Sequence, residues 1–273
     1  MRTFVILSEK PAYYLTEVDK NPNSIYCYHN PMGEQYIRSH IHQKGQFLYT
    51  EGGLVYVEME NRTYYLPARH YMWIPSNIRH AIYPSTPKVV MRNLYFPEAL
   101  ANSKFYKEEG IYPINNLLLE LLLFTKDWMG NITKNQKEKY TIVKAFKILL
   151  EETVSQSLKL ELPQARDKTL KDIVVYLSQN IHQEHLLPEL ASKFNMTDKS
   201  LYRLFKKDLG MSYIKYYTQL RIFKSLEYLM IPKYNISEIA QMVGYASMPT
   251  FSNTFVKIMG KRPSEYRNTN TIY

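Results

Sequence analysis

The C-terminal third of the chain carries one short pattern twice, and this repeat constrains the fold more than any other feature. The two copies span residues 190–210 and 239–260. The repeated residues are Phe205, Gly210 and Tyr216 in the first copy and Phe255, Gly260 and Tyr266 in the second. Each copy also places a small alanine before a polar turn, as two closely crossing helices require. We therefore predict two helix-turn-helix units.

The second helix of the first unit is predicted to present a polar face. Leu201, Leu204 and Phe205 recur at helical spacing and are expected to face inward. Asn195 suits the preceding turn, and Thr197 can cap the helix. Arginine can form two hydrogen bonds with a guanine edge, and lysines can contact phosphates. The residues assigned to DNA contact are Lys199, Ser200, Tyr202, Arg203 and Lys206.

The second unit presents a different set of side chains. Gly244 lies at its turn, asparagine can pair with adenine, and methionine and threonine can contact the thymine methyl group. The residues assigned here are Met248, Pro249, Thr250, Ser252 and Asn253. Between the units, residues 212–230 are expected to form one amphipathic helix of roughly 28 Å. That length suits two helices that enter successive major grooves about 34 Å apart.

The charge distribution supports this interpretation. Residues 166–273 hold 16 lysines and arginines against 9 acidic residues, whereas the first 165 residues hold 19 against 16. Positive charge is therefore concentrated where DNA is expected to bind. RNA or an anionic membrane would attract the same charge, and either copy alone also fits ordinary helix packing. The prediction of DNA binding depends on the two copies together.

Residues 236–267 resemble the signature of the AraC/XylS family of transcription regulators. The matching segments are Ile236-Ser237-Glu238-Ile239-Ala240, Phe251-Ser252-Asn253-Thr254-Phe255 and Gly260-Lys261-Arg262-Pro263-Ser264-Glu265-Tyr266-Arg267. The resemblance implies a seven-helix domain over residues 169–268 that binds double-stranded DNA. It also implies a homodimer, with RNA polymerase as a further candidate partner. Many members have a basic residue at the position of Asn253 and a lysine at that of Val256, so we expect the second unit to bind DNA more weakly.

The N-terminal half is predicted to be a small antiparallel barrel or sandwich. Short β-prone runs alternate with glycine, proline and asparagine between residues 25 and 96, with no helical pattern between them. The expected strands are residues 46–49, 54–59, 63–66, 70–74 and 89–95.

Polar residues of this half have the spacing of two cupin motifs. The matching patterns are His40-x-His42-x3-Gln46-x6-Gly53 and Pro75-x-Asn77-x2-His80. On one strand, His40 and His42 would face the same side, and His80 from another strand could join them. Metal-binding cupins hold a divalent metal at these positions together with a glutamate. In this chain Gln46 replaces that glutamate, Arg69 and Asn77 replace glycines, and Pro84 replaces an asparagine.

Three interpretations of these polar residues stay open. In the first, they are packed or surface residues of a barrel that keeps the cupin fold without a binding site. In the second, the polar contacts of a small-molecule effector are His40, His42, Gln46 and His80. In the third, the ligands of a divalent metal are His40, His42 and His80. No other cofactor is expected. The segments 45–49, 71–75 and 79–80 resemble the sensor half of cupin-bearing AraC-type regulators, which favours sensing over catalysis.

The predicted organisation has four parts. Residues 1–115 form the cupin-like sensor domain, residues 116–160 a helical segment, residues 161–168 a linker, and residues 169–268 the DNA-binding domain. Helices are expected over residues 116–128 and 136–158, and the family resemblance implies dimerisation through the later one. No run is long enough to span a membrane, and the single cysteine excludes an internal disulfide, so we expect a cytoplasmic protein.

The fold class we expect is α+β in two domains, with a cupin-like β-barrel and flanking helices followed by an all-α domain. The expected function is sequence-specific DNA binding by a transcription regulator that responds to a small-molecule effector, without enzyme activity. One alternative is a metal-dependent cupin enzyme, an isomerase or dioxygenase, with a helical tail. The neutral Gln46 argues against it. Another is an architectural DNA binder with no effector response.

Overall fold

The computed structural model describes residues 17–33, 36–97, 103–152 and 157–270. The chain divides into two compact units. Of the described residues, the N-terminal unit contains those before residue 161 except residues 60–63, and the C-terminal unit contains residues 60–63 and those from 161 onward. Both the α+β fold class and the division into a β-rich and a helical part are confirmed.

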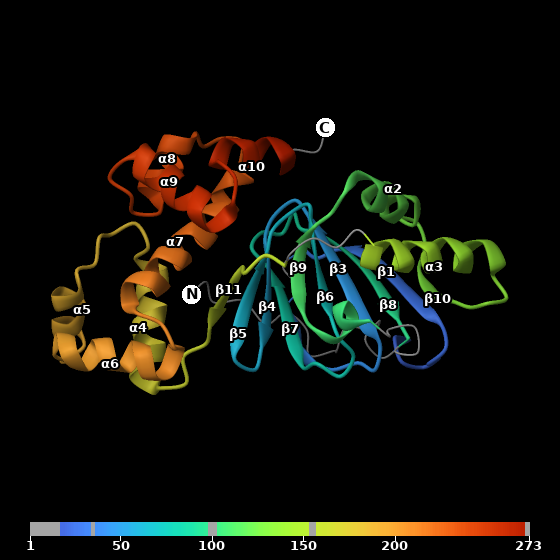
Figure 1. The fold of residues 1–273 in the computed structure, drawn as a ribbon, viewed down its shortest axis with the longest axis horizontal. Helices are drawn as coiled ribbons and strands as arrows, with labels where there is room; N and C mark the ends of the chain where they lie inside the picture. The colour runs from blue at the N-terminus through green and yellow to red at the C-terminus, as the bar shows by residue number, and fades with distance from the viewer. Residues whose placement is uncertain (1–16, 34–35, 98–102, 153–156, 271–273) are drawn as a thin grey trace. The chain divides into compact units, whose positions relative to one another are not determined.

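The strands of the chain form two antiparallel sheets, and all of them except β11 and the start of β5 belong to the N-terminal unit (Figure 1). The first has six strands in the order β10-β1-β8-β3-β6-β9, namely Gly130–Ile132, Ile25–Pro31, Val90–Phe96, Gly45–Glu51, His70–Ile74 and Gly110–Pro113. The second has five strands in the order β11-β5-β4-β7-β2, namely Glu161–Pro163, Arg62–Leu66, Val55–Met59, His80–Pro84 and Ile37–His40. The sheets bring strands that are distant in sequence next to one another, and β3 pairs with both β6 and β8.

Strand β3 is buried on both faces along most of its length. Side chains alternate across a strand, so Phe47 and Tyr49 point to one side of the sheet and Gln46 to the other. Phe47 and Tyr49 belong to a cluster that includes Phe146 of the covering helices. Gln46 contacts His80 of the second sheet. The strand therefore separates an apolar layer from the barrel interior, which explains why its sequence does not alternate between polar and apolar residues.

Two helices cover the first sheet. They are α2 (Asn116–Phe124) and α3 (Lys137–Glu152), and both are shorter than the sequence predicted. The side chain of Asn115 accepts a hydrogen bond from the Leu118 backbone N–H and so caps α2. Helix α3 packs Phe146 edge to face against Phe47, with ring centroids 5.0 Å apart. The described helices of the chain include none long and apolar enough to cross a membrane.

The described part of the C-terminal unit contains seven helices. They are α4 (Lys168–Gln179), α5 (Leu187–Lys193), α6 (Asp198–Leu209), α7 (Tyr213–Leu229), α8 (Ile236–Met242), α9 (Met248–Met259) and α10 (Pro263–Asn270). Helices α5 and α6 form one helix-turn-helix unit, and α8 and α9 form the other. Helix α7 contacts α6, which precedes it in the sequence, and α8, α9 and α10, which follow it. Two units joined by a central helix were predicted from the sequence, and this arrangement is confirmed.

The sequence repeat corresponds to a repeated ring contact. Phe205 of α6 lies edge to face with Tyr216 of α7, with centroids 5.9 Å apart, and Phe255 of α9 lies the same way against Tyr266 of α10, at 5.7 Å. In each copy the intervening glycine has a positive φ that ends the helix and turns the chain back. The spacing of phenylalanine, glycine and tyrosine, which both copies share, thus determines how α6 packs on α7 and how α9 packs on α10.

The turns also follow the residue types. Asn195 has φ +53°, as an asparagine tolerates, and the Thr197 side chain accepts a hydrogen bond from the Ser200 backbone N–H. Helix α7 differs from the prediction of a single apolar face. Buried residues lie around most of its circumference, because helices pack on it from several directions. Its 17 residues rise about 25 Å.

Candidate functional site

Helix α6 presents a basic surface that begins at Lys199, two residues after its cap. Lys199, Tyr202, Arg203 and Lys206 are exposed, whereas Ser200 is half-buried and its hydroxyl pairs with that of Thr197 at 2.9 Å. The residues assigned to DNA contact therefore share one helix. The hydroxyl of Ser200 pairs with the cap residue, so Ser200 is the least available of these five residues for a contact with DNA.

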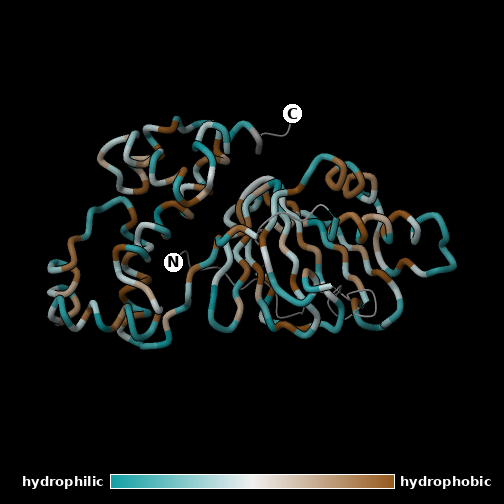
Figure 2. The backbone as a smooth tube through the Cα atoms, viewed as in Figure 1, coloured by the Kyte–Doolittle hydropathy of each residue, from teal (hydrophilic) through white to brown (hydrophobic). Residues whose placement is uncertain are grey.

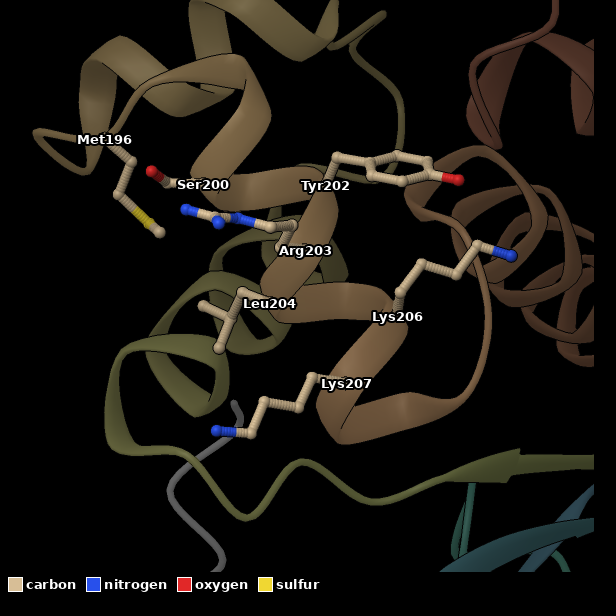
Figure 3. A pocket seen from close by; sticks show the side chains of 7 residues that line it. All are labelled: Met196, Ser200, Tyr202, Arg203, Leu204, Lys206 and Lys207. Carbon is tan, nitrogen blue, oxygen red and sulfur yellow. The ribbon is translucent and has the colours of Figure 1, made fainter.

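Arg203 lies in a surface hollow that we call the α6 hollow. It is lined by Met196, Ser200, Tyr202, Arg203, Leu204, Lys206 and Lys207. Figure 3 shows the Arg203 guanidinium extending toward Met196 and Ser200, while Tyr202 and Lys206 point to the other side of the helix. Leu204 was expected to face inward, but it is half-buried, since it lies at the border between the packed and exposed faces. The sequence analysis missed Lys207, which is one helical turn beyond Arg203 and lines the same hollow.

Helix α9 presents a less charged surface. Met248, Pro249, Thr250 and Asn253 are exposed. Ser252 is half-buried, and its hydroxyl lies 3.5 Å from the sulfur of Met248. Ser247 caps this helix by accepting a hydrogen bond from the Thr250 backbone N–H. Pro249 occupies the first turn, where a missing N–H costs nothing.

The three histidines identified by their spacing lie together in the N-terminal unit. Each of His40, His42 and His80 offers one ring nitrogen as a possible ligand, and these three nitrogens lie within 4.8 Å of one another. The ring centroids of His40 and His80 are 4.3 Å apart. His42 and His80 are buried, and His40 is half-buried. His40 ends β2 and His42 follows in the loop, so the expectation of one shared strand was wrong although both rings join the same cluster.

Gln46 connects this cluster to the opposite sheet. Its side-chain oxygen lies 3.1 Å from Nε2 of His42 and 3.0 Å from Nε2 of His80. Its amide nitrogen donates to Oδ1 of Asn93 at 2.7 Å and to the Tyr95 hydroxyl at 3.2 Å. Asn93 and Tyr95 were not predicted as site residues. The signal was present in part, because an asparagine inside the β-prone run 89–95 requires a buried partner.

Backbone groups hold the three rings in place. Nδ1 of His40 contacts the Arg38 carbonyl at 2.9 Å, Nδ1 of His42 the Lys44 carbonyl at 2.6 Å, and Nδ1 of His80 the Ile78 carbonyl at 2.8 Å. The backbone N–H of Asn77 donates to the His42 carbonyl at 2.9 Å. Asn77 has φ +62° and Arg69 has φ +58°, so both residues that replace motif glycines adopt the left-handed conformation. Asparagine tolerates this conformation better than most residues.

Burial lowers the pKa of all three histidines. The pKa of His40 falls to about 4, mainly because burial disfavours the charged ring, and the charges of His42 and Arg79 lower it further. The pKa of His80 lies well below its ordinary value for the same main reason, with added repulsion from His40 and His42. The pKa of His42 is also lowered by burial. The cluster is therefore neutral at pH 7.

Comparisons with known proteins match both halves of the chain. Residues 190–269 match the family model described as a helix-turn-helix domain, and residues 22–106 match that of the AraC-like ligand binding domain. The HTH-type transcriptional regulator NimR of Escherichia coli is 24% identical over 242 residues, which cover 88% of this chain and 86% of that protein. The lactose operon transcription activator of Staphylococcus xylosus is 31% identical and covers 37% of each chain. The transposon Tn10 TetD protein of Escherichia coli is 33% identical over 36% of this chain and 71% of that protein.

Proposed function

Because this chain belongs to the AraC family of helix-turn-helix transcription regulators and is an effector-responsive DNA-binding protein, we propose which of its residues read DNA. The main reader is α6, through Lys199, Tyr202, Arg203 and Lys206. The observation that carries this proposal is the exposure of these side chains on a helix whose opposite face, including Phe205, packs on α7.

The roles within α6 follow from side-chain chemistry. The planar guanidinium of Arg203 suits bidentate hydrogen bonding to a guanine in the major groove. Lys206 and Lys207 suit phosphates, which position the helix without reading sequence. Ser200 contributes through the cap, with its hydroxyl as a secondary contact.

Helix α9 is proposed as the second reader. Asn253 suits an adenine, and Met248 and Thr250 suit thymine methyl groups. Pro249 and Ser252 complete this surface, with Ser252 partly covered. None of these five residues is charged, so the α9 contact is expected to depend less on salt than the α6 contact. It thereby adds sequence preference rather than general affinity.

A homodimer is proposed as the DNA-binding form, with α2 at its contact. Figure 2 shows α2 as a hydrophobic segment, and its Leu117 and Phe124 are 54% and 63% exposed. Leu121, half-buried, continues the same stripe at helical spacing. The later helix α3, which the sequence analysis favoured, exposes Ile148 among mostly charged residues. An apolar stripe exposed in a single chain is a typical protein contact. A contact with RNA polymerase stays a prediction.

The effector site is proposed at His40, His42, Gln46 and His80. These are buried or half-buried polar groups that converge between the two sheets. An effector changes DNA binding only if it binds two arrangements of the protein with different affinity. The relatives are regulators, and no catalytic role is assigned to this cluster.

The test of the DNA-binding proposal is selection of genomic DNA fragments by the purified full-length protein, followed by affinity measurements on the enriched site across a salt series. Arg203→Ala is expected to lose about 1–3 kcal/mol and to relax preference at one base position. Lys206→Ala is expected to weaken binding to all DNA sequences alike and to lower the slope of the logarithm of affinity against the logarithm of salt concentration by about 1.

Lys88→Ala is the matched control, because it removes one exposed positive charge from the N-terminal unit. If Arg203→Ala and Lys88→Ala bind the selected site equally well, the assignment of α6 is wrong. Binding that is indifferent to sequence in the wild-type protein would instead favour the architectural alternative.

A further inference from the structure

We propose that His40, His42, His80 and the side-chain oxygen of Gln46 form a binding site for one divalent transition-metal ion that prefers imidazole ligands, such as Zn²⁺. The proposal rests on the proposed function in one respect, because it names the ligand chemistry of the same site. Its tests use no DNA, so its failure would leave the DNA-reading assignment unaffected.

The hydrogen bonds of the three rings determine where their protons lie. A backbone carbonyl can only accept a hydrogen bond, so the Nδ1 atoms that contact the carbonyls of Arg38, Lys44 and Ile78 must carry hydrogen. In a neutral imidazole the other nitrogen, Nε2, then carries a free electron pair. Metal-ligating histidines are usually held in this way, by a hydrogen bond from the second ring nitrogen to a carbonyl or carboxylate. All three rings thus have a ligand-competent Nε2.

Gln46 presents its side-chain oxygen to two of the rings. Its amide nitrogen donates to Asn93 and Tyr95, which turns its oxygen toward the histidines. That oxygen lies 3.0 and 3.1 Å from two nitrogens that have no hydrogen to donate. Three electron pairs therefore face one another, which is unfavourable unless a cation lies between them. At metal–nitrogen distances of about 2.1 Å, neighbouring ligand atoms are separated by roughly 3.0–3.4 Å, close to the two distances observed.

His40 supplies the third ring nitrogen of the proposed site. Its Nε2 is buried and has no hydrogen-bond partner among the described residues. A buried polar atom without a partner is costly, and a bound ion would satisfy it. His40 lies at the end of β2 and is half-buried, so it is the ligand best able to shift toward an ion.

The competing arrangement is a hydrogen-bonded core with both amides reversed. Gln46 would then donate to His42 and His80, and its oxygen would face Asn93. Asn93 would have to reverse as well. Its side-chain oxygen would then replace its amide nitrogen, which now lies 3.4 Å from the Tyr28 carbonyl oxygen, and two acceptors would face each other. His40 Nε2 would still lack a partner. This arrangement predicts no role for Gln46 in metal affinity, so metal titration of a Gln46 variant distinguishes it from the metal site.

The ligand set also determines which ions fit. Three imidazoles and an amide oxygen suit Zn²⁺, Co²⁺ or Ni²⁺, whereas Mg²⁺ and Ca²⁺ prefer carboxylates and water. All four ligands are neutral, so the bound ion would keep its full charge. Replacing Gln46 by a carboxylate should therefore tighten binding.

The experiment is titration of chelator-treated full-length protein with Zn²⁺ by calorimetry and with Co²⁺ by visible absorption, alongside Mg²⁺. We expect one Zn²⁺ or Co²⁺ per chain, a Co²⁺ spectrum typical of nitrogen ligands, and a higher midpoint of thermal unfolding with Zn²⁺. Mg²⁺ should have no effect. Imidazole ¹⁵N shifts of the metal-free protein at pH 7 should show unprotonated Nε2 on all three rings.

Variants assign the ligands. His80→Ala should abolish binding, Gln46→Ala should weaken it by roughly tenfold or more, and Gln46→Glu should tighten it. Gln46→Glu retains side-chain size, so it remains informative if His80→Ala does not fold. His182→Ala, which removes an exposed histidine outside the cluster, should bind as the wild type does. Absence of stoichiometric binding, loss of binding in His182→Ala, or unchanged affinity in Gln46→Ala would each overturn the proposal.

Discussion

Arg221 Nη2 donates a hydrogen bond of 2.6 Å to the backbone carbonyl of Gln183, which ties the central helix α7 to the loop between α4 and α5. The same guanidinium lies over the ring of Tyr217 at 4.3 Å and near that of Tyr245 at 5.6 Å. Tyr245 follows the turn of the second helix-turn-helix unit. One side chain therefore contacts the loop before the first helix-turn-helix unit and the turn of the second unit.

We expect Arg221→Ala to weaken binding to a site that engages both readers by roughly tenfold. A hydrogen bond from a charged group contributes about 1.5–3 kcal/mol, and part of this loss should appear as looser placement of the readers. Fluorescence anisotropy on the full site and on a site scrambled under one reader measures the effect. Equal losses on both DNAs would show that Arg221 does not set the relation between readers.

Gly244 is expected to tolerate no side chain. Its φ is +82°, and a Cβ there would lie 2.6 Å from Nη2 of Arg221 and 2.8 Å from the Ile181 carbonyl. Gly244→Ala should lower the free energy of unfolding by at least 1 kcal/mol, about the cost of left-handed backbone alone, and more through the contact. Gly210→Ala is the control, because Gly210 has a similar φ and nothing within 4 Å of a Cβ. Urea unfolding compares the two, and an equal loss would show that the contact with Arg221 is unimportant.

Acidification should destabilise the N-terminal unit. The pKa of His40 is about 4 in the folded protein and near 6.5 when unfolded, so the unfolded chain binds more protons between these values. The free energy of unfolding should therefore fall as pH decreases from about 6.5 to 4, by up to about 1.4 kcal/mol per pH unit for each such histidine. His29, whose pKa burial also lowers to about 4, adds to the effect.

Urea unfolding of the metal-free protein at pH 7.5 and 5.5 measures this dependence. His40→Gln should show a smaller loss on acidification than the wild type, and His182→Gln the same loss as the wild type. A wild-type stability that rises as pH falls through this window would contradict the assignment of buried, neutral rings.

Charge placed on the apolar stripe of α2 should separate the proposed dimer. Phe124→Glu is expected to raise the dissociation constant by at least tenfold, since it puts a charge into an apolar contact. Ile148→Glu makes the same change on α3 and should have little effect. Analytical ultracentrifugation of both variants distinguishes the helices. The reverse result would restore the later helix as the dimer contact.

The helical half was predictable because its signals are local. Helical spacing places Phe205 on the packed face, Gly210 permits the reversal, and Tyr216 follows at the distance needed for ring contact. Each step lies within a few residues of the next. Helix α7 was predicted in extent, but its wide burial depends on helices that pack from several sides, and no single periodicity reports that.

The barrel was less predictable because pairing across long sequence distances defines it. Strand β2 has four residues with mostly exposed or half-buried side chains, and β7 ends in a proline. Strand β11 lies in the stretch predicted as a linker. Such short strands exist because a neighbour pairs with them. In the site, motif spacing identified the histidines, whereas Asn93 reaches Gln46 only through the pairing of β3 with β8.

Strand β3 puts Gln46 and Phe47 on opposite faces of a single sheet. One side chain touches His80, and the next touches the ring of Phe146 on α3. A peptide bond is rigid, so a displacement of one side chain's backbone is shared by its neighbour. The histidine cluster and the helical layer consequently lie on opposite faces of the same strand, so a shift of the backbone at position 46 would displace a residue that packs directly on α3.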